Sequence, residues 1–145
     1  MKSIEKPYKF FDVTADIGFY AFGNTLEESF ENAAIAMFNI ISNTDNIKPT
    51  KKIRFTVESE DKVSLLYDFL EEILFYHEVE FMLFSKFTLK INKIDERYIL
   101  DALIKGEDIN WNVHERGSEV KAITFHQMEV NENKNYYEVK AILDL

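Results

Sequence analysis

The side chains of this sequence that could do chemistry are mainly carboxylates near the two ends of the chain. Asp12 and Asp16 are four residues apart, so they would point the same way if that stretch is one regular strand. At the other end, Asp144 and the terminal carboxylate of Leu145 directly follow a strand-like segment, which should hold them in ordered structure. Hard cations such as calcium, magnesium and manganese prefer clusters of oxygen ligands. Ordinary acidic residues at turns and strand ends are the competing interpretation of this pattern.

Other common catalytic and metal-binding patterns are absent from the sequence. The chain has no cysteine, which excludes disulfides, zinc–cysteine clusters and thiol nucleophiles. His77, His114 and His126 form no H-x-x-x-H pair, and ordinary structural or surface roles suit them better. No G-x-S-x-G, P-loop or G-x-G-x-x-G motif is present. The carboxylates could also serve a metal-dependent phosphoester hydrolase. We rank this function below the alternatives given below, because no general base stands beside the carboxylates.

The composition predicts one acidic domain that spans residues 1–145. Hydrophobic residues make up 46% of the chain, and the net charge is −9. We expect no direct binding to nucleic acid or to an anionic membrane, because both require a basic surface. The sequence begins without the apolar core of a secretory signal, and no apolar run approaches the ~20 residues that span a bilayer. These features favour a cytoplasmic protein whose partner is a basic protein or a cation.

The elements that must position the first carboxylates are two strands and a helix. Residues 8–13 and 16–23 predict the strands, and in the second one apolar residues alternate along the chain. Thr25 and Glu28 form a T-x-x-E capping box, which marks the start of a helix. The apolar face of this helix consists of Leu26, Phe30, Ala33, Ala34, Met37, Phe38 and Ile41.

The rest of the chain predicts a second helix and more strands. The helix begins at about Asp61, and its apolar face consists of Leu66, Phe69, Leu70, Ile73 and Leu74. Strands are expected at 52–59, 82–94 and 97–105, and a hairpin is expected from 119–130 and 136–145. Two helices among about seven strands, without regular alternation, predict an α+β fold. We expect both helices to pack on a mixed but largely antiparallel sheet within a single domain.

Four segments of the sequence resemble those of one known family, in the same order. They are TADIGFYAFGNTLEESFENAAIAMF, SLLYDFLEEILFYHE, GSEVKAITFHQMEV and the C-terminal LDL. The chain resembles archease, whose pattern has His-Thr-Ala-Asp, a strand, a Gly-Asp-Thr/Ser-Leu-Glu-Glu-Ala-Phe helix start and a penultimate Asp. The resemblance covers nearly the whole length and implies the archease fold.

The resemblance also implies a function, which is that of an accessory protein and not of a stand-alone enzyme. Archeases assist the RNA-splicing ligase that joins tRNA halves in tRNA splicing. They promote guanylylation of the ligase on its own histidine, support repeated turnover and broaden its use of nucleotides. Two alternatives remain beside this expectation. One is a general chaperone or protein-interaction module, and the other is the hydrolase considered above.

A divalent metal site near the two chain ends is the third implication of the resemblance. Calcium is the expected metal, with magnesium or manganese as alternatives. Carried over by position, the ligands are Asp16, Asp144 and the terminal carboxylate of Leu145. Asp12 matches an acidic position that often precedes the motif, and we expect it to support the site without ligating the metal. Val13 stands where the family usually has His, so any hydrogen bond from that His is lost here.

Overall fold

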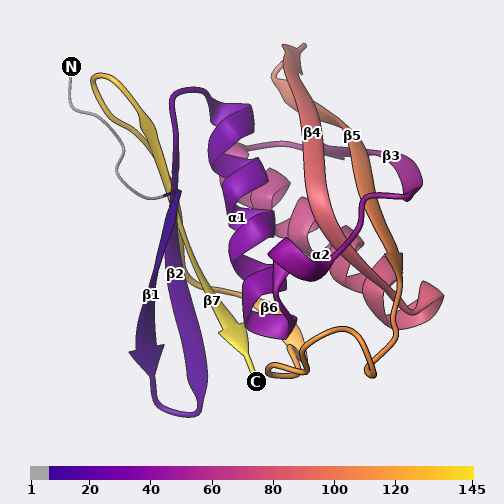
Figure 1. Cartoon of the computed structure of the whole chain (residues 1–145). Coiled ribbons are helices and arrows are strands. Elements are labelled where there is room, and N and C mark those ends of the chain that lie inside the picture. The colour runs from indigo at the N-terminus through magenta and orange to yellow at the C-terminus, as the bar shows by residue number, and fades with distance from the viewer. Residues whose placement is uncertain (1–6) are drawn as a thin grey trace.

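Seven strands form two antiparallel sheets in the computed structural model, which describes residues 7–145 (Figure 1). The first sheet has the order β1 (Tyr8–Val13), β2 (Asp16–Gly23), β7 (Tyr137–Asp144) and β6 (Ala122–Glu132). The second has the order β3 (Lys51–Ser59), β5 (Arg97–Asp108) and β4 (Met82–Ile94). The predicted α+β class is confirmed. The division of the strands between two sheets was not predicted, and every pairing among the described strands is antiparallel.

The two helices lie between the sheets and close one hydrophobic core. Helix α1 (Leu26–Ile41) contacts both β2 and β4, and α2 (Lys62–Glu80) contacts both β6 and β3 (Figure 1). Stacked rings of Phe30 and Phe69, with centroids 6.2 Å apart, join the two helices. Large aromatic side chains bury more apolar area than most others, so they dominate the stability of such a core. The fully buried aromatic residues are Phe19, Phe30, Phe38, Phe69 and Phe84.

The predicted start of α1 is confirmed by its capping bonds. Thr25 Oγ1 accepts a hydrogen bond of 3.1 Å from the backbone N–H of Glu28. The Glu28 side chain in turn accepts one of 3.1 Å from the N–H of Asn24. The first bond satisfies an N–H group that the first helical turn leaves without a partner, and the second ties the residue before the cap to the helix. They also fix the point at which β2 ends and the helix begins.

The C-terminal end of α1 is capped by a distant loop that leads into β6. Backbone N–H groups of Gly117 and Ser118 donate to the carbonyls of Ile41 and Ile40, each at 2.9 Å. A Cβ atom on Gly117 would lie 2.3 Å from the Ile40 oxygen, so the loop can approach this closely only with glycine. A short 3₁₀ helix, η1 (Thr44–Asn46), follows α1. The loop therefore fixes where β6 starts.

Helix α2 begins and packs as its sequence predicts. Asp61 caps it, because its Oδ1 accepts a hydrogen bond of 2.7 Å from the N–H of Ser64. The helix ends at Glu80, and the C-cap residue Phe81 has a left-handed backbone with φ 54°. Among residues 7–145, no helix is long and apolar enough to cross a membrane. The buried residues of α2 are Leu65, Leu66, Phe69, Leu70, Ile73 and Leu74.

Two glutamates of α1 cover the free edge of β4. The Glu31 side chain accepts a hydrogen bond of 2.9 Å from the N–H of Leu89, and Glu27 accepts one of 3.3 Å from the N–H of Ile91. Residues four apart on a helix lie about 6 Å apart, and residues two apart on a strand are separated by a similar distance. The two glutamates can therefore reach two alternate N–H groups of the strand. Burial raises the pKa of Glu31, and the Leu89 hydrogen bond partly opposes this rise. The contact attaches α1 to the second sheet.

Candidate metal centre

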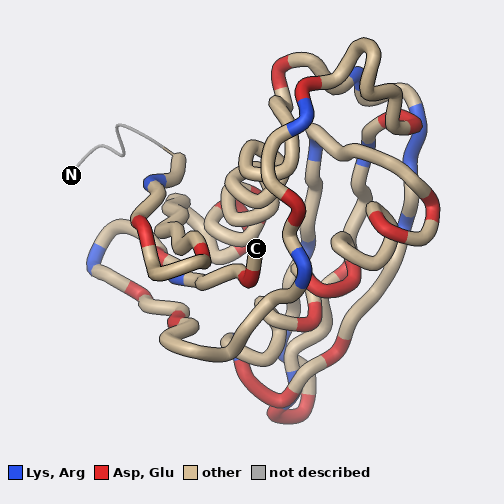
Figure 2. The backbone as a smooth tube through the Cα atoms, turned by 90° about the horizontal axis from the view of Figure 1, so that it is seen from below, with Lys and Arg blue, Asp and Glu red and all other residues tan. Residues whose placement is uncertain are grey.

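The structure brings Asp16 and Asp144 together at one end of the first sheet. Asp16 is the first residue of β2 and Asp144 is the last residue of β7, and the two are register partners. Directly opposed residues of an antiparallel pair have Cβ atoms about 4.5–5.5 Å apart. Leu145 follows Asp144, and Figure 2 shows the C-terminus on this side of the molecule with an acidic position directly before it. All three predicted ligand positions therefore lie within one small region.

The two carboxylates lie on the face of the first sheet that is turned away from α1. Side chains alternate along a strand, and the neighbouring Ile17 and Leu143 face the core instead. Among residues 7–145, the four ion pairs involve neither Asp16 nor Asp144. Like charges directly opposite one another destabilise a strand pair. A cation held between the two carboxylates would remove that repulsion.

The donor atoms available here suit a hard cation. Oxygen ligands fit calcium, magnesium or manganese, whereas zinc in structural sites prefers sulfur and nitrogen. The part of the chain that the structure describes contains no group of three or more His, Cys, Asp or Glu side chains that could hold a metal. Asp16 and Asp144 supply two side chains, and the carboxylate of Leu145 remains the predicted third group. The Lys121 N–H donates a hydrogen bond of 2.8 Å to the Asp144 carbonyl, which fixes the backbone just before that group.

The structure corrects the expected direction of Asp12. A turn at Thr14 and Ala15 separates β1 from β2, so Asp12 and Asp16 do not lie on one regular strand. Asp12 pairs with Ile17 and therefore faces the opposite side of the sheet from Asp16. The two carboxylates would point the same way only on one regular strand, and that condition is not met because the chain reverses between them.

Val13 is the residue that faces Asp16 across the β1–β2 ladder. A side chain at position 13 therefore lies on the same face as the two candidate ligands. Ala15, between them in the turn, has φ 62°, a left-handed conformation that costs an alanine roughly 1–2 kcal/mol. The turn thus positions Asp16 at the expense of local backbone strain.

A cluster around Lys140 on the same face was not found from the sequence. Five residue steps of β6, from Thr124 to Glu129, face two steps of β7, so β6 carries a large bulge. The bulge brings Gln127 to Lys140, whose Nζ donates to the Gln127 Oε1 at 2.9 Å. Lys140 Nζ also lies 5.6 Å and 5.7 Å from the ring centroids of Phe11 and Tyr20. In the sequence, the break in the alternation of apolar and polar residues within ITFHQMEV could have indicated this bulge.

Two of the three histidines have the structural roles that the sequence predicts. His77 Nδ1 lies 2.8 Å from the Met82 carbonyl, to which it donates. Buried His114 accepts the Asn110 N–H at Nδ1, so its Nε2–H donates to Glu107 Oε2 at 2.8 Å. The hydrogen bond from the Lys48 N–H lowers the pKa of Glu107 most, and the hydrogen bond from His114 lowers it further. His126 is exposed in the β6 bulge.

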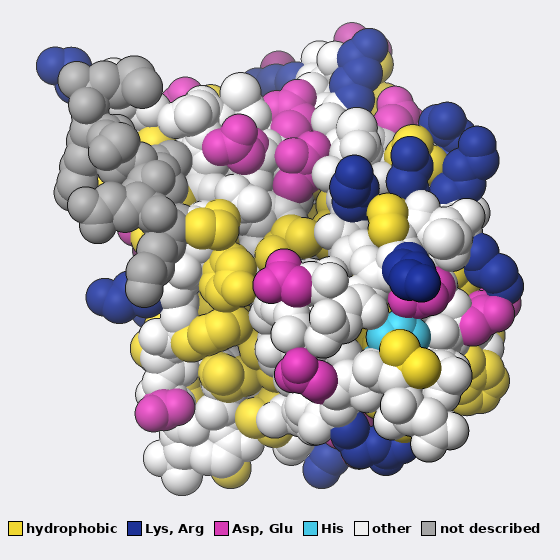
Figure 3. Space-filling model, in the orientation of Figure 1, with side chains coloured by type: hydrophobic (Ala, Val, Ile, Leu, Met, Phe, Trp, Pro, Cys, Tyr) yellow, Lys and Arg dark blue, Asp and Glu magenta, His cyan; other side chains and the backbone are white. Residues whose placement is uncertain are grey.

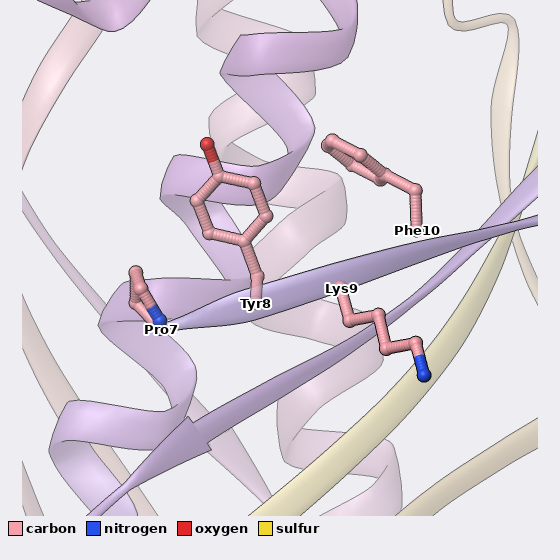
Figure 4. Close-up of a pocket in the computed structure, with 4 residues that line it drawn as sticks. All are labelled: Pro7, Tyr8, Lys9 and Phe10. Carbon is pink, nitrogen blue, oxygen red and sulfur yellow. The ribbon is translucent and has the colours of Figure 1, made fainter. Parts of the chain in front are cut away.

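The surface also has hollows that the candidate ligands do not line. On the face shown in Figure 3, hydrophobic side chains gather in a band between the first sheet and α1. A cavity of about 370 Å³ lies at the start of β1, where Tyr8 and Phe10 project from one face of the strand and Lys9 from the other (Figure 4). Another cavity of about 360 Å³ lies between α2 and the start of β6, close to the chain end.

Fold and site together define a small acidic α+β protein with two opposed carboxylates at the end of its first sheet. The sequence model of the archease protein family matches residues 8–145 of this chain. Protein archease of Methanothermobacter thermautotrophicus is 49% identical over 140 residues, which cover 97% of this chain and 99% of that protein. The chain belongs to the archease family.

Solved structures support the same assignment. A solution structure from Methanobacterium thermoautotrophicum has a TM-score of 0.87 at 49% identity, and the match covers 96% of this chain and 99% of the other. The crystal structure of an archease from Thermotoga maritima, described as a possible chaperone, has a TM-score of 0.61 at 18% identity over the whole of both chains. At that identity the likeness concerns the fold alone.

Proposed function

We propose that this protein is a non-enzymatic activator of the RNA-splicing ligase that acts in tRNA splicing. It promotes guanylylation of the ligase, repeated turnover and wider use of nucleotides. The observation that carries the proposal is the register pairing of Asp16 with Asp144 in a member of the archease family. A net charge of −9 suits a protein partner with a basic surface better than direct contact with RNA.

In this proposal Asp16, Asp144 and the terminal carboxylate of Leu145 hold a divalent cation. Calcium suits three carboxylates best, since it accepts variable coordination, and magnesium or manganese are alternatives. When bound, the cation supplies a fixed positive charge at the end of the first sheet. The paired strands β2 and β7 hold the two aspartates in one geometry. The resulting rigid tip would dock beside the nucleotide site of the ligase and help to order it.

The test is a guanylylation assay with the ligase of the same organism, with and without this protein. We expect the wild-type protein to accelerate guanylylation and to support repeated turnover. Asp16→Asn and Asp144→Asn keep the side-chain shape and remove the charge, so both should abolish stimulation. Asp12→Asn is the matched control, because Asp12 faces the opposite side of the sheet. A wild-type protein without effect on the ligase would refute the proposal.

A role of Asp16 in folding alone must be separated from this function. Thermal unfolding of wild type and Asp16→Asn, with calcium and with EDTA, makes the distinction. Binding of the cation to the folded state should raise the melting temperature of the wild type alone. If Asp16→Asn unfolds at a much lower temperature in EDTA than the wild type, its loss of stimulation reflects the fold and not the site.

A general chaperone is the second candidate function. Exposed hydrophobic side chains support it, namely Phe75, Val79, Phe81, Val113 and Phe125. The Thermotoga maritima archease is also described as a possible chaperone. This function predicts that the protein suppresses aggregation of several unrelated heat-unfolded proteins and has no specific effect on the ligase.

A further inference from the structure

The groove between α2 and the start of β6 has the features of a docking site for a protein segment. Its volume is about 360 Å³, and it is open to solvent along one side of α2. Apolar and acidic side chains both line it. Its apolar lining comes from Tyr67, Leu74 and Phe75 of α2 and from Ala122 and Ile123 of β6.

Large hydrophobic side chains are exposed in this groove and beside it. Phe75 is 49% exposed, and Val79, one helical turn further on, is 50% exposed. The bulge in β6 presents Phe125, which stacks on the Tyr67 ring at 3.9 Å between centroids and remains 55% exposed. Clustered exposed aromatic residues at a hollow mark binding surfaces more often than plain surface. These residues therefore supply a place for an apolar anchor.

The charge around the groove defines its occupant. Helix α2 carries five acidic residues and one lysine, and three of those acids, Glu71, Glu72 and Glu78, line the groove. Lys121 is the one basic residue among the groove's lining residues. A groove that is lined by both acidic and apolar side chains is complementary to a segment that carries Lys or Arg beside an apolar side chain. A nucleic acid would be repelled by the same acidic side chains.

The groove ends beside the candidate metal centre. Ala122, at its end, is the register partner of Asp144, and the Lys121 N–H is hydrogen-bonded to the Asp144 carbonyl at 2.8 Å. A partner that contacts the Asp16–Asp144 pair would therefore have the groove beside it. One body can occupy both surfaces.

We propose that this groove binds a basic, apolar-anchored segment of the ligase, so the inference rests on the proposed function. The anchor enters between Phe75 and Ile123, and its basic neighbours pair with Glu71 and Glu78. The groove supplies affinity, and the carboxylate tip supplies activation. The two surfaces therefore have separate effects in a titration.

The experiment titrates the ligase with the full-length protein and measures two quantities. Biolayer interferometry gives the Kd, and the guanylylation rate gives the maximal stimulation. Phe75→Ser and the double variant Glu71→Lys/Glu78→Lys change exposed side chains, so the fold should persist. Each should raise the Kd about tenfold or more and leave maximal stimulation at saturation intact. The wild-type Kd should also rise with salt, and that of the charge variant should rise less.

Matched controls lie outside the groove. Phe81→Ser removes a more exposed aromatic residue just past α2, and Glu96→Lys reverses a charge in the β4–β5 turn. Both should keep the Kd within about twofold of wild type. Asp16→Asn should show the opposite pattern to the groove variants, since it loses maximal stimulation.

Three results would overturn the inference. Groove variants with the wild-type Kd would refute the groove and leave the activator function standing. A dimer of this protein that Phe75→Ser dissociates, seen by sedimentation, would assign the groove to a second copy instead. A wild-type protein that neither binds nor stimulates the ligase would refute the activator function and the groove with it.

Discussion

Val13 of β1 lies directly opposite Asp16 of β2, at the position where the family pattern has His. Val13→His would place an imidazole beside the candidate ligand. A histidine that hydrogen-bonds or joins a metal site changes its affinity by about 10–100-fold. We expect manganese to bind about tenfold more tightly and calcium, which prefers oxygen, to change little. Isothermal titration calorimetry measures both.

Lys9→His is the control for that variant, since Lys9 lies on the same face of β1 but pairs with Tyr20. It should leave the affinity for manganese unchanged. Equal gains in Val13→His and Lys9→His would mean that any added surface histidine recruits the metal.

Extension of the chain beyond Leu145 tests the third ligand. Two added residues, Gly-Ser, convert the terminal carboxylate of Leu145 into a neutral peptide group. We expect calcium affinity to fall about tenfold or more, because ligand charge sets the affinity of such sites. The apo melting temperature should not change, because β7 already ends at Asp144. The same two residues added at the N-terminus serve as the control. An unchanged calcium affinity would remove Leu145 from the ligand set.

Glu31 and Leu89 offer a test of how α1 is attached to the second sheet. Glu31→Ala leaves the Leu89 N–H without its partner and should lower the free energy of unfolding by about 1–2 kcal/mol. Glu31→Gln keeps an acceptor and removes a carboxylate whose pKa is raised by burial, so it should be neutral or stabilising at pH 7. The stability that this raised pKa contributes is present below the unfolded pKa of about 4.3 and is lost as the pH rises through the folded pKa. Urea unfolding at several pH values should therefore show the advantage of Glu31→Gln shrinking in acid.

The Glu107–His114 pair predicts the opposite dependence on pH. The pKa of Glu107 is lowered in the folded protein by the Lys48 N–H and by His114. Its stabilisation is present above the unfolded pKa of about 4.3 and is lost as the pH falls through the folded pKa. Glu107→Gln should therefore unfold at lower urea than wild type at pH 7, with the difference shrinking below about pH 4. A difference that is constant across pH would contradict the charge-assisted role.

Strain in the β1–β2 turn gives a fifth prediction. Ala15 has φ 62°, so Ala15→Gly removes the steric cost of a left-handed residue. The free energy of unfolding should rise by roughly 0.5–1 kcal/mol, measured by urea unfolding. Ala122→Gly, in β6, should instead lower it by a similar amount, because glycine weakens a regular strand. A loss of stability in both variants would mean that the turn is relaxed.

Local sequence patterns predicted the helices and strands well, but they could not predict which strands pair with one another. The capping box at Thr25 correctly marked the start of α1, because capping depends on neighbours a few residues away, and α2 begins beside Asp61 as expected. The pairing of β2 with β7 joins residues more than a hundred positions apart, which periodicity cannot reveal. The division into two sheets and the bulge that carries Phe125 were missed for the same reason.

The candidate site shows the same division between local and distant information. The family resemblance alone linked Asp16 with Asp144, which pair across β2 and β7, and spacing gave no link between the chain ends. Spacing also failed for Asp12, because two residues of turn reverse the chain and send Asp12 to the other face. The place of Val13 opposite Asp16 follows from that same turn.

The glutamates that cover β4 also bear on how the protein behaves when it is concentrated. An uncovered strand edge invites another chain to pair with it, which leads to aggregation and fibrils. Along β4, a 13-residue edge strand, Glu27 and Glu31 already occupy the N–H groups of Ile91 and Leu89. An incoming strand would have to displace both bonds and approach two carboxylates. Glu27 and Glu31 therefore protect this edge against pairing with another chain, and replacing both would increase aggregation while the buried residues of α1 keep the core in place.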